Sequence, residues 1–302
     1  MFFRASFVLA VSVLAASIAA QTPTRLTLGT YAFRKPTEIY KQFQPVTIEL
    51  SRLLTAQMGE PMAVELHITK SYEECLDSFV DGKIDMVRFG PASYVLAKRR
   101  NPKVELLGAE KEDSRGVGLI VVRDDSPIKT LGDLVGKRFA FGDPMSTIGR
   151  YLSQAELARA NVVGSQLAGF AYLDRHDIVF KAVEIGDYDA GALHADTWKE
   201  LNGKAARRLR ILHSFDNVPK PWVARAGLGD GVVAALRTSL LKLDEPAALK
   251  ALKVPGFVPT TDVEYDIVRK GMEGAARFAP LEPPRVPTAA PVPAPSPAPT
   301  RG

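Results

Sequence analysis

The sequence predicts an α/β protein made of two lobes, each a mixed, mostly parallel sheet flanked by helices. Short apolar runs alternate with segments of helical periodicity along the chain. Its 302 residues are enough for about two domains. The alternation starts again in the second half, and two connections, near 120–125 and 215–225, would join the halves. Ligands of open α/β sheets bind beyond the carboxyl ends of strands, so we expect a ligand cleft between the lobes.

The first half contains five predicted strands: residues 25–29, 63–68, 84–89, 104–109 and 117–123. The amphipathic run from Phe43 to Met58 predicts a helix, with Pro45 in its first turn and Gly59 as its end. Ser71-Tyr-Glu-Glu74 has the form of a capping box, which places Tyr72 at the start of the next helix. Gly90-Pro91 leads from the third strand directly into a further helix.

The second half begins with a strand, a turn and a helix that together suggest a site for an anion. Residues 138–141 are apolar, Gly142-Asp-Pro144 breaks the strand, and Ser146-Thr147 opens a helix. The free N–H groups and the dipole at a helix start favour negative charge. Gly149 leaves the first turn bare, so a ligand can approach the backbone. A simple Ser/Thr cap with nothing bound gives the same pattern.

The rest of the second half supplies two more predicted strands and three helices. The strands are residues 170–173 and 189–193, and the helices are residues 177–185, 232–243 and 263–278. Gly186 caps the first of these helices. The predicted organisation is then 21–122 for the first part of lobe 1, 123–217 for lobe 2 and 218–279 for the return to lobe 1.

Both ends of the chain differ in composition from the rest. Arg4 and the apolar run that follows it, ending in small residues, indicate a secretory signal peptide over residues 1–20, and therefore export to the periplasm. Residues 280–302 hold nine of the 22 prolines, which predicts an extended, disordered tail. Composition also excludes several classes of function. Without a long Lys/Arg block, the net charge of +5 does not indicate nucleic-acid binding. One Cys and four His offer no zinc-type cluster, so we expect no metal and no cofactor.

Five sequence motifs within residues 26–275 resemble those of periplasmic substrate-binding proteins of the phosphonate, phosphite and phosphate type, and they occur in the same order. They are Ser71-Tyr-Glu-Glu with Phe-Val-Asp-Gly-Lys-Ile-Asp85, Phe89-Gly-Pro-Ala-Ser-Tyr94, the run from Asp125 to Lys137, Gly142-Asp-Pro-Met-Ser-Thr-Ile-Gly149, and Arg175-His-Asp177 with the run from Ala182 to Gly191. The resemblance implies a type II periplasmic binding protein fold that closes on its ligand. It implies capture of a small oxyanion for an ABC permease, by a protein that is a monomer and not an enzyme.

The same resemblance implies where the ligand binds. In the family the Ser-Thr-Ser-Gly turn wraps the oxyanion; here Ile148 replaces the second Ser, and Phe89 stands where a Tyr would offer a hydroxyl. Arg88, Arg115 and Arg150 can supply charge-assisted donors instead. Our candidate ligand-binding residues are Tyr31, Tyr72, Arg88, Phe89, Gly90, Ser146, Thr147, Gly149, Arg150, His176 and Asp189.

Three alternative functions are compatible with these residues. Ser146, His176 and Asp189 are the residue types of a hydrolase triad, but the chain lacks a Gly-x-Ser-x-Gly elbow. A solute receptor that signals to a membrane sensor kinase would use the same cleft. A binder of a different organic acid would keep the fold and rely on the arginines.

Overall fold

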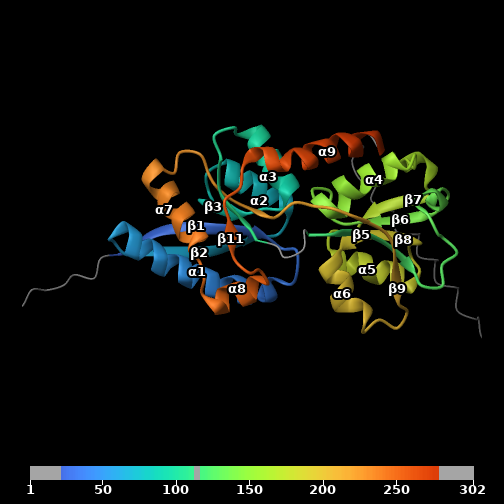
Figure 1. The fold of residues 1–302 in the computed structure, drawn as a ribbon, viewed down its shortest axis with the longest axis horizontal. Helices are drawn as coiled ribbons and strands as arrows, with labels where there is room; N and C mark the ends of the chain where they lie inside the picture. The colour runs from blue at the N-terminus through green and yellow to red at the C-terminus, as the bar shows by residue number, and fades with distance from the viewer. Residues whose placement is uncertain (1–21, 112–115, 279–302) are drawn as a thin grey trace, which may run out of the picture.

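The computed structural model describes residues 22–111 and 116–278, which form two α/β lobes side by side (Figure 1). The predicted signal peptide, Arg115 and the predicted tail lie outside the described residues. Within the described residues, no helix has the length and apolar character needed to cross a membrane.

The first lobe is built on a six-stranded sheet in the order β11-β4-β10-β3-β1-β2. Its strands are β1 (Thr24–Tyr31), β2 (Met62–Thr69), β3 (Met86–Arg88), β4 (Glu105–Glu110), β10 (Pro221–Ala224) and β11 (Phe257–Val258). β1 runs parallel to β2 and β3, whereas β10 runs antiparallel to β3 and β4. Its helices are α1 (Pro36–Met58), α2 (Tyr72–Val80), α3 (Pro91–Arg100), α7 (Asp230–Leu241) and α8 (Pro246–Leu252).

The second lobe is built on a five-stranded sheet in the order β7-β6-β8-β5-β9. Its strands are β5 (Gly118–Arg123), β6 (Arg138–Phe141), β7 (Gly169–Tyr172), β8 (Ala190–His194) and β9 (Leu209–Phe215). A π-helix (Thr147–Leu152) leads into α4 (Ser153–Arg159), and α5 (His176–Ile185) and α6 (Ala195–Asn202) follow later. Short 3-10 turns occupy Leu131–Leu134 and Gly164–Gln166. The prediction of two α/β lobes with mixed sheets is confirmed.

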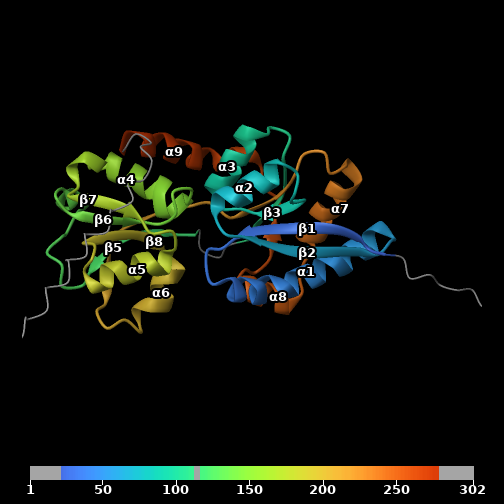
Figure 2. The same cartoon turned by 180° about the vertical axis from the view of Figure 1, so that it is seen from behind.

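Helices cover both faces of each sheet, as Figure 2 shows from behind. In the first lobe, Phe43 of α1 and Trp222 of β10 are fully buried in the core under α1, α7 and α8, and Phe79 is fully buried under α2 and α3 on the other face. In the second lobe, one core lies under α4 and the other under α5. Burial of apolar surface, at about 25 cal/mol per Å², is the main force holding these layers together.

Helix α1 begins nine residues before Pro45, so the prediction that Pro45 lies in its first turn is wrong. Pro36 takes the first helical position, where the missing N–H costs nothing. An internal proline costs a helix about 3 kcal/mol. The apolar stripe that includes Ile39, Phe43 and Leu50 is fully buried, and its packing offsets that cost. Strands β9, β10 and β11 and helices α6 and α8 were not predicted. Helix α6 buries none of its residues, the apolar pattern of β9 is irregular, and β10 lies in the segment that was expected to be a connection.

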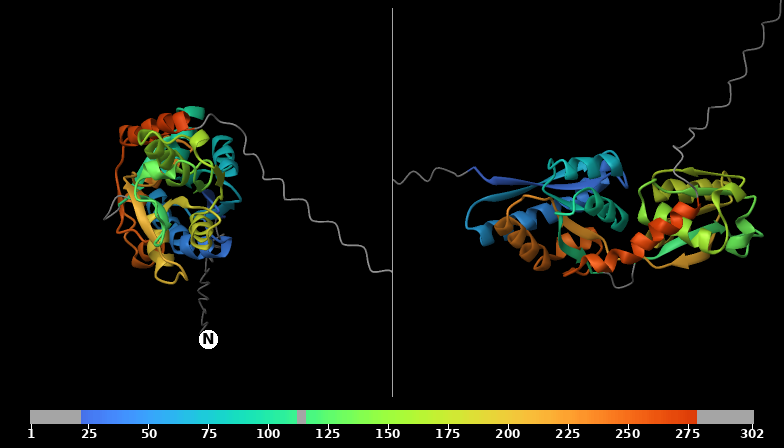
Figure 3. Two further views of the ribbon diagram at one scale, coloured as in Figure 1. Left: turned by 90° about the vertical axis from the view of Figure 1, so that its right-hand side faces the viewer. Right: turned by 90° about the horizontal axis from the view of Figure 1, so that it is seen from above.

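The chain crosses between the lobes earlier than the sequence suggests. Residues 118–123 form β5, which pairs with β8 and β9 in the second sheet, so the first crossing lies between β4 and β5. The second crossing follows β9. A third connection, α9 (Asp266–Phe278), lies along one side of both lobes (Figure 3) and packs against α4 of the second lobe.

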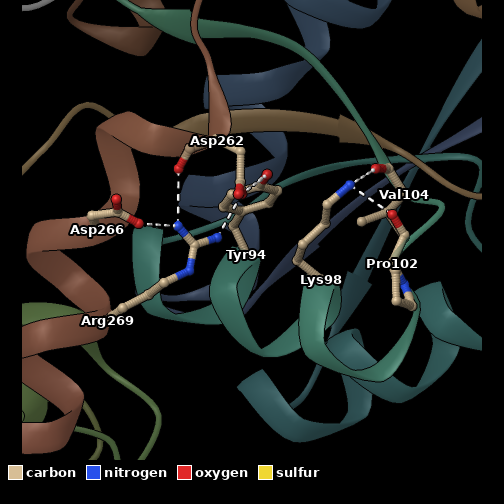
Figure 4. Close-up of polar contacts among 7 residues, drawn as sticks. All are labelled: Tyr94, Lys98, Pro102, Val104, Asp262, Asp266 and Arg269. Carbon is tan, nitrogen blue, oxygen red and sulfur yellow. Dashed lines mark hydrogen bonds and ion pairs between the residues drawn. The ribbon is translucent and has the colours of Figure 1, made fainter.

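A polar cluster fixes the start of α9 to the first lobe (Figure 4). The Tyr94 hydroxyl of α3 donates a hydrogen bond of 2.6 Å to the Asp262 carboxylate. Arg269 binds the same carboxylate at 2.6 Å and Asp266 at 2.7 Å. Lys98, on the same helix as Tyr94, closes the C-terminal end of α3 by donating to the carbonyls of Pro102 and Val104. Helix α9 is therefore anchored in one lobe and packed on the other.

Candidate functional site

A cleft of about 950 Å³ lies between the two lobes. The first-lobe wall comes from the end of β1 and the start of α1, and the second-lobe wall comes from the starts of α5 and α6. Four of the predicted site residues line it: Tyr31, Tyr72, Arg88 and His176. The volume is within the range of sites that enclose small organic ligands.

Tyr31 and Tyr72 form a stacked pair where the cleft meets the interface between the lobes. Their ring centroids are 3.5 Å apart and the rings are inclined by 23°. The Tyr72 hydroxyl lies near Tyr31 and near Ser146 of the second lobe, and both act on its pKa. Burial raises the pKa of Tyr31 to about 12 and raises that of Tyr72 well above its ordinary value. Both hydroxyls therefore stay protonated and can donate to an anion.

The predicted anion-binding turn is closed against the first lobe. The Ser146 hydroxyl caps the π-helix by accepting from the Gly149 N–H at 3.0 Å. The Thr147 hydroxyl accepts from the Ala92 N–H at 2.9 Å, in the first turn of α3, and the Tyr31 hydroxyl accepts from the Gly90 N–H at 2.8 Å. In both lobes, hydroxyl groups of the protein therefore already accept hydrogen bonds from these N–H groups at the helix starts. The turn does not line the cleft.

Gly149 is needed at this turn because two backbone segments approach closely there. A Cβ atom on Gly149 would lie 2.9 Å from the Cα of Gly142, closer than real contacts allow. The Gly142 N–H donates to the Gly149 carbonyl at 2.8 Å. A Cβ on Gly142 would in turn meet Cε1 of His176 at 3.7 Å. His176 therefore lies between the turn and the cleft.

Arg88 lies on the cleft wall with its charge balanced by Glu110. The two side chains form a two-point ion pair, and the Trp222 indole N–H donates to the same carboxylate at 3.3 Å. Burial alone would raise the pKa of Glu110, but the charges of Arg88 and Lys220 outweigh it and lower the pKa below its ordinary value. Both side chains are buried, so this pair belongs to the packed wall.

Three other predicted residues lie outside the cleft. Phe89 is fully buried and packs edge-on against Phe79. Arg150 donates to the Pro144 carbonyl at 2.5 Å and lies over the ring of Tyr151. Asp189 accepts from the Arg138 N–H at 2.8 Å, which joins the starts of two neighbouring strands. Their contacts hold the local structure together.

The cleft also contains functional candidates that sequence reasoning missed. His194 ends β8 and caps α6 by accepting from the Asp196 N–H at 3.1 Å. The sequence feature that could have identified His194 is its place as a polar residue directly after the predicted strand 189–193, at the carboxyl end of that strand. Arg34 and Glu200 form an ion pair of 3.2 Å that joins the two lobes across the cleft. No local pattern predicts a pair 166 residues apart.

The two histidines in the cleft are electrically neutral. Burial lowers the pKa of His176 to about 4, and the charge of Lys220 acts in the same direction. Burial and Lys220 also lower the pKa of His194 well below its ordinary value. Among the described residues, no three His, Cys, Asp or Glu side chains gather closely enough to hold a metal ion.

Comparison with known proteins agrees with this geometry. A sequence model for the periplasmic substrate-binding proteins of phosphonate ABC transporters matches residues 28–265. The phosphate-import protein PhnD of Mycolicibacterium smegmatis is 27% identical, over 82% of this chain and 84% of that protein. The probable phosphite-binding protein PhnD1 of Prochlorococcus marinus is also 27% identical, over 74% and 78%.

The fold has matches among solved structures. Prochlorococcus marinus PhnD1, solved in complex with methylphosphonate, superposes with a TM-score of 0.76 and 23% identity, covering 85% of this chain and all of that one. The family match spans most of the chain and includes the turn, both tyrosines and His176. The chain therefore belongs to the family of periplasmic substrate-binding proteins of phosphonate ABC transporters.

Proposed function

We propose that this protein is exported to the periplasm by a cleaved signal peptide and captures a small phosphorus oxyanion (phosphonate, phosphite or phosphate) for an ABC permease. The observation that carries the proposal is the cleft between two lobes of this family, with neutral donors on its walls. The relatives from Mycolicibacterium smegmatis and Prochlorococcus marinus are described as phosphate-import and phosphite-binding proteins. The protein acts as a monomer.

The oxyanion binds in the cleft beside Tyr31, Tyr72 and His176. The hydroxyls of Tyr31 and Tyr72, which remain protonated, donate from the first lobe. The turn from Ser146 to Gly149 and the ring of His176 approach from the second lobe. Neutral donors suit this task because an oxyanion buried between them needs hydrogen bonds and not full countercharges. Arg88 adds no separate countercharge for the ligand, since Glu110 balances its charge.

Ligand exchange requires the lobes to part. The Thr147 to Ala92 hydrogen bond and the Arg34 to Glu200 ion pair both join the lobes, so this conformation is a closed one. Opening breaks both contacts and exposes the donors of the turn and of α3. The ligand then stabilises the closed state because only that state brings Tyr31 and Tyr72 of the first lobe and His176 of the second lobe around one cleft.

The protein has no catalytic role in this proposal. The Ser146 hydroxyl accepts from Gly149, and the Asp189 carboxylate accepts from the backbone of Arg138. Among the described residues, no hydrogen bond joins Asp189 to His176. These contacts do not connect the three residues as a hydrolase triad requires.

A thermal-shift screen of the mature chain, residues 21–302, tests the proposal. The ligands are phosphate, phosphite, methylphosphonate, methanesulfonate and acetate. A phosphorus oxyanion at 100 times its dissociation constant adds about 2.7 kcal/mol of stability and raises the Tm. Tyr72→Phe removes one donor and weakens binding by about fivefold to twentyfold. Tyr40→Phe, at a tyrosine that is 52% exposed on α1, is the control and leaves the affinity unchanged.

Stabilisation by sulfonates or carboxylates alone would contradict the choice of ligand. Stabilisation by none of the five would contradict the proposal as a whole. The partner is tested by gene neighbourhood: permease and ATPase genes indicate import, whereas a histidine kinase gene indicates sensing.

A further inference from the structure

The cleft is larger than a ligand such as methylphosphonate needs. Its volume of about 950 Å³ is at the upper end of the range found for sites that enclose drug-sized molecules. The lobes are already joined across it by the Arg34 to Glu200 ion pair, so this volume belongs to a closed conformation. A ligand that fills the cleft has to carry a substituent on its phosphorus atom, and the side chains around that substituent indicate its chemistry.

His194 has a hydrogen-bond donor without an acceptor on the second-lobe wall. It ends β8 and lines the cleft, and its Nδ1 accepts from the Asp196 N–H at 3.1 Å. A nitrogen that accepts carries no proton, so in the neutral ring the proton is on Nε2. That Nε2 is buried and has no hydrogen-bond partner among the described residues. Because buried polar groups are rarely left unpaired, the Nε2–H indicates an acceptor atom on the ligand.

The groups around His194 would hold a negatively charged acceptor at this place. The neighbouring ring of His176, with its centroid 6.5 Å away, does not accept from Nε2. The carboxylate of Asp196 lies at the other nitrogen, 3.7 Å from Nδ1. The charges with the largest effect on His194 are positive, and they include those of Lys220 and Lys199. An acceptor that reaches Nε2 therefore enters a region of positive potential.

Basic side chains outnumber acidic ones along the cleft. Its lining includes eight Lys and Arg residues and five Asp and Glu residues. Arg34 is paired with Glu200, and Arg88 is paired with Glu110. Four lysines of the lining have no ion-pair partner in the described part of the chain: Lys35, Lys41, Lys111 and Lys199. This excess of positive charge favours an anionic substituent and opposes an ammonium group.

We propose that the ligand carries a second anionic group, a carboxylate on the substituent of its phosphorus atom, and that Nε2–H of His194 donates to this carboxylate. The inference rests on the proposed function. The phosphorus oxyanion binds beside Tyr31 and Tyr72, and the carboxylate binds at His194, where Lys199 and Lys220 add positive charge. His194 is therefore a specificity-determining residue for the substituent.

The end of the substituent then decides how tightly a phosphonate binds. A carboxylate oxygen accepts from the Nε2–H, and a hydrogen bond from a buried donor to a charged acceptor strengthens binding by about 10-fold to 100-fold. An alkyl substituent leaves the donor unpaired. An ammonium group has no lone pair with which to accept, and the charges of Lys199 and Lys220 repel it. Phosphonates that end in a carboxylate should therefore bind most tightly, and those that end in an ammonium most weakly.

Isothermal titration calorimetry of the wild-type mature chain tests the inference without any variant. Phosphonoacetate and 3-phosphonopropionate carry a carboxylate at two distances from phosphorus. Ethylphosphonate and propylphosphonate are their neutral counterparts, and 2-aminoethylphosphonate carries an ammonium group. At least one carboxylate should bind at least tenfold more tightly than its neutral counterpart, and 2-aminoethylphosphonate should bind more weakly than ethylphosphonate.

The failure of the inference can be told from the failure of the proposed function. If the neutral phosphonates bind and both carboxylates gain less than tenfold, or if 2-aminoethylphosphonate binds most tightly, the second anionic group is wrong and the proposed function stands. If no phosphonate of the series binds, and neither phosphate nor phosphite does, the proposed function fails and the inference with it.

A variant that keeps the cap of α6 assigns the effect to His194. His194→Asn retains a side-chain oxygen that can cap α6, as Nδ1 does, but it has no atom in the place of Nε2. The ratio of the affinities for the tighter carboxylate and its neutral counterpart should fall by about tenfold or more. An unchanged ratio would overturn the assignment to His194, whether or not both affinities fall.

Lys199→Gln tests the charge beside His194. Lys199 is exposed on α6, so the loss of its charge should lower the same ratio by about twofold to fivefold. Lys129→Gln is the matched control, because Lys129 is an exposed lysine of the second lobe that does not line the cleft, and it should leave the ratio unchanged. Equal losses in the two variants would mean that the net charge of the protein attracts the carboxylate, and would overturn the role of the cleft lysines.

Discussion

The boundary between the lobes has two regions of opposite character, which meet at the stacked rings of Tyr31 and Tyr72. In the first, hydroxyls of the turn pair with helix-start N–H groups, as in the Thr147 to Ala92 hydrogen bond. This region is buried, and the groups that pair across it are uncharged. In the second, the open cleft, charged side chains such as Lys220 surround two neutral histidines.

The difference shows that the protein itself can satisfy donors of the kind that hold an oxyanion. Thr147 gives the start of α3 the oxygen that an anion would otherwise offer. In the cleft, His176 and His194 each keep one buried nitrogen that has no hydrogen-bond partner among the described residues. Protein contacts therefore hold the lobes together in one region, while the other contains buried polar atoms that these contacts leave unsatisfied. Variants that act on only one region can test this division.

The largest effect is expected from the charged wall of the cleft. Glu110→Gln removes the carboxylate that balances the buried Arg88 and should lower the free energy of unfolding by about 3–5 kcal/mol. Because the folded pKa of Glu110 lies below its ordinary 4.5, the stabilisation is fully present above that pH. It is lost as the pH falls through the folded value. Urea denaturation at several pH values measures both effects.

The control is a solvent-exposed ion pair. Glu65→Gln breaks the pair with Arg25, whose side chains are 55% and 64% exposed, and should cost about 0–1 kcal/mol. An equal, small loss in both variants would mean that the Arg88 pair does not stabilise the wall.

A smaller effect is expected from the buried region in which turn hydroxyls pair with helix-start N–H groups, here called the sealed region. Thr147→Val leaves the Ala92 N–H without an acceptor and should lower the free energy of unfolding by about 1–3 kcal/mol. Thr147→Ser keeps the hydroxyl and should behave like the wild type. Thr30→Val is a matched control, because the buried Thr30 hydroxyl has no hydrogen-bond partner in the described part of the chain. A loss in Thr30→Val as large as in Thr147→Val would remove the interlobe bond as the explanation.

The sequence predicted the fold well where local chemistry determines it. The Ser71 hydroxyl caps α2 by accepting from Glu74, and Gly186 ends α5 in the left-handed conformation with φ of 91°, both as expected. Strand and helix alternation was sufficient for the two lobes. The prediction for Pro45 failed because buried packing along the whole of α1 outweighs the local preference of one proline.

The site was less predictable because its partners are distant in the sequence. The charge of Arg88 suggested a ligand donor, but its partner Glu110 is brought to it by the sheet, in which β10 lies between their strands. The role of Thr147 depends on a helix 55 residues away. His194 and His176 each follow a local rule, yet their unpartnered nitrogens are defined only once both rings lie in one cleft.

The smallest effect is expected where the cleft is bridged by exposed charges. Glu200→Gln breaks the interlobe pair with Arg34 at 3.2 Å and weakens a contact with Lys253 at 3.9 Å. The Arg34 and Glu200 side chains are 35% and 43% exposed, so stability should change by less than about 1 kcal/mol. Because the pair exists only in the closed state, ligand should dissociate about twofold to fivefold faster in stopped-flow measurements.

Two comparisons separate closure from simple electrostatics. Asp81→Asn breaks an exposed pair with Lys83 inside the first lobe and should leave the dissociation rate unchanged. In 1 M salt, where the screening length falls to about 3 Å, the difference between Glu200→Gln and the wild type should largely disappear. A difference that persists in high salt would mean that Glu200 acts through packing. No difference at low salt would mean that the hydroxyl contacts of the sealed region hold the lobes closed without help from this pair.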